Sequence, residues 1–125
     1  MCSTRLQCVV AGGAPCDFRA LPARSPLLLY WLGGTRLDKP QLYEQASPVS
    51  FISKDDPPMF FFHGAVDNIV PLASPRQMSE QLTAAGCDAQ MYVVPNAGHG
   101  AAFVDPQAGA QAIKFLDAHL KPLSR

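Results

Sequence analysis

The chain has 125 residues, a length typical of one domain with a single hydrophobic core, so we expect residues 1–125 to form one domain. Its ten basic and ten acidic residues give a formal net charge of zero without any run of like charge. This balance excludes the strongly basic surfaces that bind nucleic acids or acidic membranes, and no apolar stretch is long enough to span a membrane.

The cysteines are not spaced as zinc ligands. Four are present and none forms a C-x-x-C pair: Cys2, Cys8, Cys16 and Cys87. A domain of this size does not need disulfide bonds to fold. We therefore expect reduced thiols, a cytoplasmic location, and neither a metal nor another cofactor.

The N-terminal part of the chain predicts a buried strand followed by irregular helical structure. The apolar run LQCVVA, residues Leu6–Ala11, ends at two glycines and is typical of a strand covered on both faces in a parallel sheet. Between residues 21 and 34, two prolines exclude one long helix and favour one or two short helices. The leucines beside Tyr30 and Trp31 predict core packing, with the wall of a substrate pocket as the alternative.

Helices and strands alternate in the rest of the chain. The expected elements are a short helix at residues 36–45, a strand at Met59–Phe62, a helix at residues 74–85, a strand at Gln90–Val94 and a last helix from Asp105. Ser74 and Gln77 predict a capping box for the longer middle helix, and Asp105 predicts the N-cap of the last one. The last helix carries three apolar residues on one face, namely Ile113, Leu116 and Leu120.

This order of elements predicts an α/β fold with about three parallel strands and flanking helices. In such sheets the functional groups lie in the loops that follow the carboxyl ends of the strands. Asp67 follows the strand at Met59–Phe62, and His99 follows the strand at Gln90–Val94. We therefore expect Asp67 and His99 at the same edge of the sheet, on neighbouring strands.

An aspartate beside a histidine has one obvious chemical use. A carboxylate that accepts a hydrogen bond from one imidazole nitrogen fixes the tautomer, so the other nitrogen can take a proton from a nucleophile and later return it. His99 lies between Gly98 and Gly100, in a turn that we expect to present the ring. An acid that precedes the histidine matches the chain order Ser, Asp, His of one hydrolase fold.

The stretch from Tyr43 to Phe103 resembles the C-terminal half of α/β-hydrolase-fold serine hydrolases, in particular esterases and lipases related to prolyl oligopeptidases and dienelactone hydrolases. Five short motifs carry the resemblance by their order and spacing: Ala46-Ser47-Pro48, Asp56-Pro57-Pro58, His63-Gly64 followed by Asp67, Val70-Pro71, and Gly98-His99-Gly100. The resemblance implies that Asp67 orients His99 in a Ser-Asp-His triad of a carboxylic-ester hydrolase.

The third member of that triad has no counterpart in these 125 residues. The sequence contains neither the Gly-x-Ser-x-Gly elbow that carries the family's nucleophile nor the HGG-type loop that contributes to its oxyanion hole. The resemblance therefore implies a partial α/β-hydrolase fold from which the N-terminal half is absent. We expect the isolated chain to be inactive, and to act on a small ester or peptide only when a nucleophile is supplied.

Two other functions stay open. A truncated or degenerate hydrolase can serve only as a binding or dimerising module. Alternatively, the chain can use a borrowed nucleophile, such as Cys16 or a serine of a second copy. Two further histidines have simpler interpretations, because we expect His63 to be structural, with a metal site shared with Asp67 and His99 as the alternative, and His119 to be solvent-exposed.

A partial sheet also predicts a partner. Without the strand that bears the nucleophile, the strand at Leu6–Ala11 presents an open edge that can pair with another chain. We expect a second copy, exchanged segments or a complementary N-terminal half to cover this edge.

Overall fold

Three parallel strands form the centre of the structure, a computed structural model that describes residues 5–120. The strands lie in the order β1-β2-β3, with bounds β1 Val9–Gly12, β2 Met59–Gly64 and β3 Ala89–Val94. Phe61 of β2 is opposite Ala11 on one side and Met91 on the other. The predicted fold class of three parallel strands with flanking helices is confirmed.

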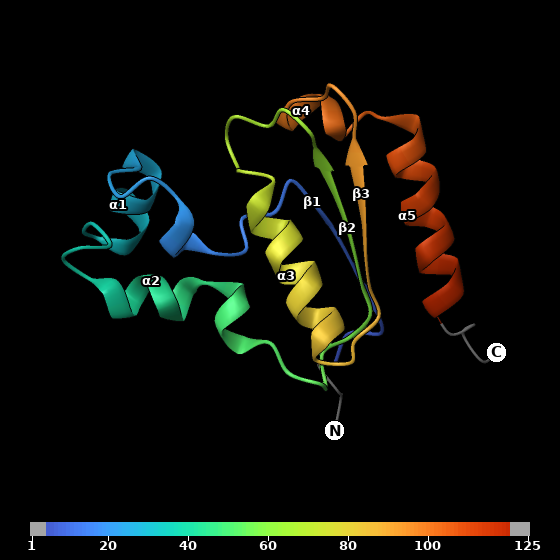
Figure 1. Cartoon of the computed structure of the whole chain (residues 1–125), viewed down its shortest axis with the longest axis horizontal. Coiled ribbons are helices and arrows are strands. Elements are labelled where there is room, and N and C mark those ends of the chain that lie inside the picture. Colours follow the sequence, from blue (N-terminus) through green and yellow to red (C-terminus); the bar gives the residue numbers. More distant parts are fainter. Residues whose placement is uncertain (1–4, 121–125) are drawn as a thin grey trace.

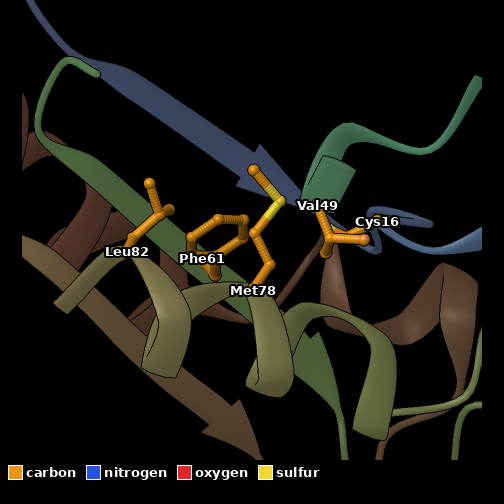
Figure 2. Close-up of a cluster of buried hydrophobic side chains, with 5 residues drawn as sticks. All are labelled: Cys16, Val49, Phe61, Met78 and Leu82. Atoms are coloured by element: carbon orange, nitrogen blue, oxygen red, sulfur yellow. The ribbon is translucent and has the colours of Figure 1, made fainter. Parts of the chain in front are cut away.

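Helices cover both faces of the sheet (Figure 1). They are α3, Ala73–Ala84, on one face and α5, Pro106–His119, on the other. Successive strand residues point to opposite faces, so the run of phenylalanines in β2 serves both layers. Phe61 packs with Met78 and Leu82 of α3 (Figure 2), whereas Phe60 packs on Phe115 of α5 with 5.7 Å between ring centroids.

The start of α3 differs from the prediction. The helix begins at Ala73, and its N-cap residue, Leu72, makes no side-chain capping bond. Ser74 is instead buried, and its hydroxyl accepts hydrogen bonds from the backbone N–H groups of Cys16, at 2.8 Å, and Asp17, at 3.2 Å. The capping box of Ser74 and Gln77 was therefore wrong, because a distant loop uses the hydroxyl that a cap would need.

The apolar face of α5 was also assigned wrongly. Asp105 caps the helix as expected, accepting a hydrogen bond from the N–H of Ala108 at 2.7 Å. The buried residues of the helix are Ala108 and Phe115, and the predicted stripe is mostly turned outward, with Ile113 and Leu120 exposed. The small Ala108 packs with the residues that follow β3, and Phe115 lies one heptad later on the same side of the helix.

Two short helices lie beside the sheet (Figure 1): α1, Pro26–Leu32, and α2, Pro40–Ala46. They pack on each other through Leu28 and Tyr43 together with Leu21. The predicted core packing of the leucine-rich patch holds for Leu28, which is buried, but Tyr30 and Trp31 are exposed on α1. The single-turn helices η1, Phe18–Ala20, and η2, Pro48–Phe51, connect this part to the sheet.

The helix α2 is shorter than predicted at its start. Thr35 and Asp38 form a turn in which the Thr35 hydroxyl donates to the Asp38 carboxylate at 2.6 Å, and the helix begins after it at Pro40.

Of the cysteines, Cys8, Cys16 and Cys87 are free thiols, and Cys2 lies outside the described residues. Between residues 5 and 120, no helix is long and apolar enough to cross a membrane.

Candidate active site

The structure brings Asp67 and His99 together at the carboxyl edge of the sheet. Asp67 lies in the loop after β2, and His99 is the first residue of α4, His99–Ala102, which follows β3. The Nδ1 atom of His99 lies 2.8 Å from Oδ2 of Asp67. The neighbouring positions of β2 and β3 therefore place the acid and the histidine in direct hydrogen-bond contact.

Backbone groups hold the Asp67 carboxylate in place. Its Oδ1 atom accepts hydrogen bonds from the N–H groups of Ile69, at 2.8 Å, and Val70, at 2.9 Å, and the side chain is 0% exposed. Burial raises the pKa of Asp67, but the bonds from Val70, His99 and Ile69 outweigh it and leave the pKa below its usual value. The carboxylate is therefore ionised at neutral pH and accepts a hydrogen bond from the Nδ1–H group of His99.

His63 supports the same loop from within the core. Its side chain is fully buried, and its Nε2 atom lies 2.8 Å from the carbonyl oxygen of Val70 and 3.2 Å from Oδ2 of Asp67. A carbonyl oxygen only accepts hydrogen bonds, so we assign the ring proton to Nε2. His63 thus ties the end of β2 to the acid loop through its hydrogen bond to the carbonyl of Val70.

Gly64 lets the loop that precedes His99 approach β2. A Cβ atom at Gly64 would overlap the carbonyl oxygen of Ala97. The same carbonyl accepts a hydrogen bond from the N–H of Val66 at 3.1 Å. By contrast, Gly98 and Gly100 have open space around them, so the two glycines that flank His99 have no steric part in holding the ring.

The His99 ring is partly open to solvent. Its side chain is 29% exposed, and Phe103 contacts it edge to face with 5.6 Å between ring centroids. The bond to Asp67 assigns the ring proton to Nδ1, which leaves the lone pair on Nε2 as the basic site. Within the part of the chain that the structure describes, Nε2 of His99 has no hydrogen-bond partner.

Cys16 is unsuited to the part of a borrowed nucleophile. Its side chain is buried in the core beside Val49 and Phe61 (Figure 2). Burial, with a smaller contribution from Asp17, raises the pKa of the Cys16 thiol to about 11. At neutral pH this leaves on the order of one thiol in ten thousand ionised, and the thiolate is the reactive form. Its burial and raised thiol pKa therefore argue against Cys16 as a nucleophile.

A buried polar cluster around Asp17 explains one of the sequence motifs. Asp17 makes a two-bond ion pair with Arg19, at 2.8 and 3.1 Å, and the Arg19 bonds hold the pKa of Asp17 below its usual value despite burial. Ser47 is completely buried, and its hydroxyl accepts from the N–H of Phe18 and donates to the carbonyl of Tyr43. The Ala46-Ser47-Pro48 motif thus joins η1 to α2 and does not belong to the Asp67 site.

A second carboxylate–imidazole pair lies on the surface. The Nε2 atom of His119 is 2.9 Å from Oδ2 of Asp88, with side-chain exposures of 22% and 46%. The Nδ1 atom of His119 also lies 2.8 Å from the carbonyl oxygen of Phe115. His119 is therefore partly buried, and its predicted exposure was wrong. Among residues 5–120, no three histidine, cysteine or acidic side chains are placed to hold a metal ion.

Sequence reasoning missed the neighbours that fix the pair. The N–H groups of Ile69 and Val70 follow from the turn that an aspartate forms with the residues two and three positions later. That signal was present in the sequence. The contacts of Phe103 and Gly13 with the His99 ring depend on tertiary packing, and no local pattern indicates them.

Comparison with known proteins identifies similar sequences and folds. The profile of the BD-FAE family matches residues 2–82. The esterase LipQ of Mycobacterium tuberculosis is 37% identical over 93 residues, which cover 70% of this chain and 22% of that protein. The chain thus spans about a fifth of the length of the curated relatives it matches.

Solved structures with a similar fold also include an esterase. A truncated carbohydrate esterase from gut microbiota has a TM-score of 0.81 and 26% identity, with 93% of this chain and 44% of that chain covered. A bifunctional GH43-CE protein of Bacteroides eggerthii has a TM-score of 0.83 and 27% identity, with 94% and 16% covered. The fold of residues 5–120 is therefore part of a larger esterase fold.

Proposed function

This chain belongs to the BD-FAE family and has part of the α/β-hydrolase fold of esterases, and from this premise we propose that it contributes the acid and the base of a carboxylic-ester hydrolase. The observation that carries the proposal is the 2.8 Å contact between Nδ1 of His99 and Oδ2 of the buried Asp67 carboxylate. The position of both residues in loops at the carboxyl edge of a parallel sheet supports it.

In the proposed mechanism, His99 moves protons and Asp67 orients it. Nε2 of His99 takes the proton of a serine hydroxyl while the serine oxygen attacks the ester carbonyl. The imidazolium, stabilised by Asp67, returns that proton to the departing alcohol, which leaves an acyl-enzyme. His99 then takes a proton from water as the water attacks the acyl group, and it returns this proton to the serine oxygen as the carboxylic acid is released.

The serine and the oxyanion donors come from a segment outside these 125 residues. Within residues 5–120, β1 pairs with a strand on one edge only. We infer that the segment that bears the nucleophile adds a strand at this open edge, with a second copy or exchanged segments as the other partners that can cover it. A compact, unaggregated monomer of the chain alone at micromolar concentration would contradict the need for any partner.

A chimera tests the proposed function. The part of LipQ that precedes its match is joined to this chain, and hydrolysis of short p-nitrophenyl esters is measured. We expect turnover by the chimera and none above a boiled control by the chain alone, because the chain lacks a serine elbow. His99→Ala should abolish turnover, and His119→Ala is the matched control. A folded chimera that hydrolyses esters equally well with His99→Ala would overturn the proposal.

A further inference from the structure

Gly13 lies where the first strand meets the candidate site. It follows β1 directly, is buried, and has a φ of +57°, in the left-handed region that favours glycine. Its N–H donates a hydrogen bond to the carbonyl oxygen of Phe62 at 3.0 Å, which extends the pairing of β1 with β2 by one residue. The backbone of Gly13 is therefore fixed to the sheet and does not move freely.

This fixed backbone lies against the imidazole of His99. A Cβ atom at Gly13 would be 2.7 Å from Cε1 and 3.2 Å from Nδ1 of His99, and 3.2 Å from the ring of Phe103. The first distance is too short for two carbon atoms that are not bonded. Of the groups involved, the His99 ring is the one that can move, because it is the end of a side chain, whereas Gly13 is tied to Phe62.

We propose that Gly13 is a positioning residue for His99. Because Gly13 has no side chain, it leaves a space, here called the seat, that the imidazole of His99 occupies when it bonds to Asp67. Three elements then hold the ring. The end of β1 lies against Cε1, Phe103 contacts the ring edge to face, and the loop after β2 binds Nδ1 through Asp67. A side chain at position 13 would push the ring away and break the bond to Asp67. The catalytic importance of this seat depends on the proposed function, but the seat itself does not.

Proton NMR of the intact 125-residue chain tests the proposal without any catalysis. An Nδ1 proton held by a buried carboxylate resonates downfield of the amide protons and exchanges slowly. We expect this signal in the parent chain and its loss in Gly13→Ala. Gly33→Ala is the matched control, because Gly33 has a φ of +66° and only the flexible end of Lys39 nearby. Gly33→Ala carries a similar backbone strain but adds no atom beside the His99 ring, so it should keep the signal.

A second variant separates the seat from backbone strain. Asparagine tolerates the left-handed region better than alanine does, yet it has a Cβ atom. Gly13→Asn should therefore fold more readily than Gly13→Ala and still lose the Nδ1 signal. Circular dichroism confirms that each variant is folded. If either folded Gly13 variant keeps the signal at the parent position and intensity, the proposed seat is wrong.

The chimera with LipQ adds a functional measurement. If the ring is displaced by about 1 Å, kcat should fall roughly 100-fold, because catalysis depends on the placement of the base. KM should change little, since Gly13 lies against His99 and the base acts in the chemical step. An unchanged kcat in a chimera that contains Gly13→Asn would also contradict the proposal. An inactive parent chimera would count against the proposed function, whereas the NMR result would still decide the seat.

Discussion

The Asp67–His99 pair and the Asp88–His119 pair have nearly the same length, 2.8 and 2.9 Å, but different surroundings. The Asp67 side chain is completely buried and binds two backbone N–H groups, whereas the Asp88 side chain is 46% exposed. Both nitrogens of His119 face acceptors, in Asp88 and in the carbonyl of Phe115. Among residues 5–120, His99 uses only Nδ1 in this way, so its Nε2 lone pair is left to take a proton.

The two pairs have similar lengths, so distance alone does not distinguish a pair that is suited to catalysis from one that is not. An exposed carboxylate is solvated and screened, so it orients its partner weakly. A buried carboxylate fixed by backbone donors holds one tautomer and one ring orientation. Placement at the carboxyl edge of the sheet adds the site at which a substrate can meet the histidine.

The largest expected effect is on catalysis. In the chimera with LipQ, Asp67→Asn should lower kcat by about 10⁴-fold, because the amide cannot hold His99 in the tautomer that leaves Nε2 basic. Asp88→Asn changes the same functional group in a pair of similar length and should leave kcat within about twofold. Steady-state hydrolysis of a p-nitrophenyl ester measures both. Equal losses in the two variants would remove the functional distinction between the pairs.

The next effect is on folding. Asp67→Ala should lower the free energy of unfolding by about 2–4 kcal/mol, because the buried N–H groups of Ile69 and Val70 lose their acceptor. Asp88→Ala should lower it by less than about 1 kcal/mol, since its contact with His119 is on the surface. Urea denaturation of the 125-residue chain measures both changes. A larger loss for Asp88→Ala would reverse the comparison.

Lowering the pH should reduce the stability that the ionised Asp67 carboxylate adds to the fold. The pKa of Asp67 in the folded chain is below its usual value of 3.8, so its ionisation stabilises the fold fully above that value. This stabilisation is lost as the pH falls through the lower, folded pKa. The difference in unfolding free energy between the parent chain and Asp67→Asn should therefore narrow from pH 7 to about pH 2.5. A gap that widens with acid would contradict the direction of the shift.

The smallest expected effect is the response to salt. In a double-mutant cycle, the coupling between Asp88 and His119 should be below about 1 kcal/mol and should decrease when salt is raised. The coupling between Asp67 and His99 should change less, because the carboxylate is buried. Unfolding free energies at low and high ionic strength give both couplings. A stronger salt dependence at Asp67 would show that solvent reaches this pair.

Much of the fold could be predicted from the sequence because the strands are marked by hydrophobic runs and glycines. The run of phenylalanines in β2 predicts a strand that is covered on both faces, and the structure packs Phe60 and Phe61 in opposite directions. Errors occurred where tertiary contacts override local rules. The hydroxyl of Ser74 fits an N-cap by spacing, yet it bonds to the loop at Cys16 and Asp17.

The candidate site was predictable in its members but not in its support. Parallel strands place Asp67 and His99 at one edge, and this follows from the order of elements alone. The glycines next to His99 indicated a special turn, but the close approaches are made by Gly13, which follows β1 and lies against the His99 ring, and by Gly64 of β2, which lies against the carbonyl of Ala97. The role of Gly13 and Gly64 depends on how neighbouring strands pack side by side. The spacing of residues within one segment does not predict this packing.

The rate at which a fluorophosphonate probe labels the chimera tests the central claim most directly. The probe reacts with an activated serine, so its rate reports whether His99 takes the serine proton. We expect rapid labelling of the parent chimera and of His119→Ala, and a rate at least about 10³-fold lower for His99→Ala. Labelling of a folded His99→Ala chimera at the parent rate would contradict the assignment of His99 as the base.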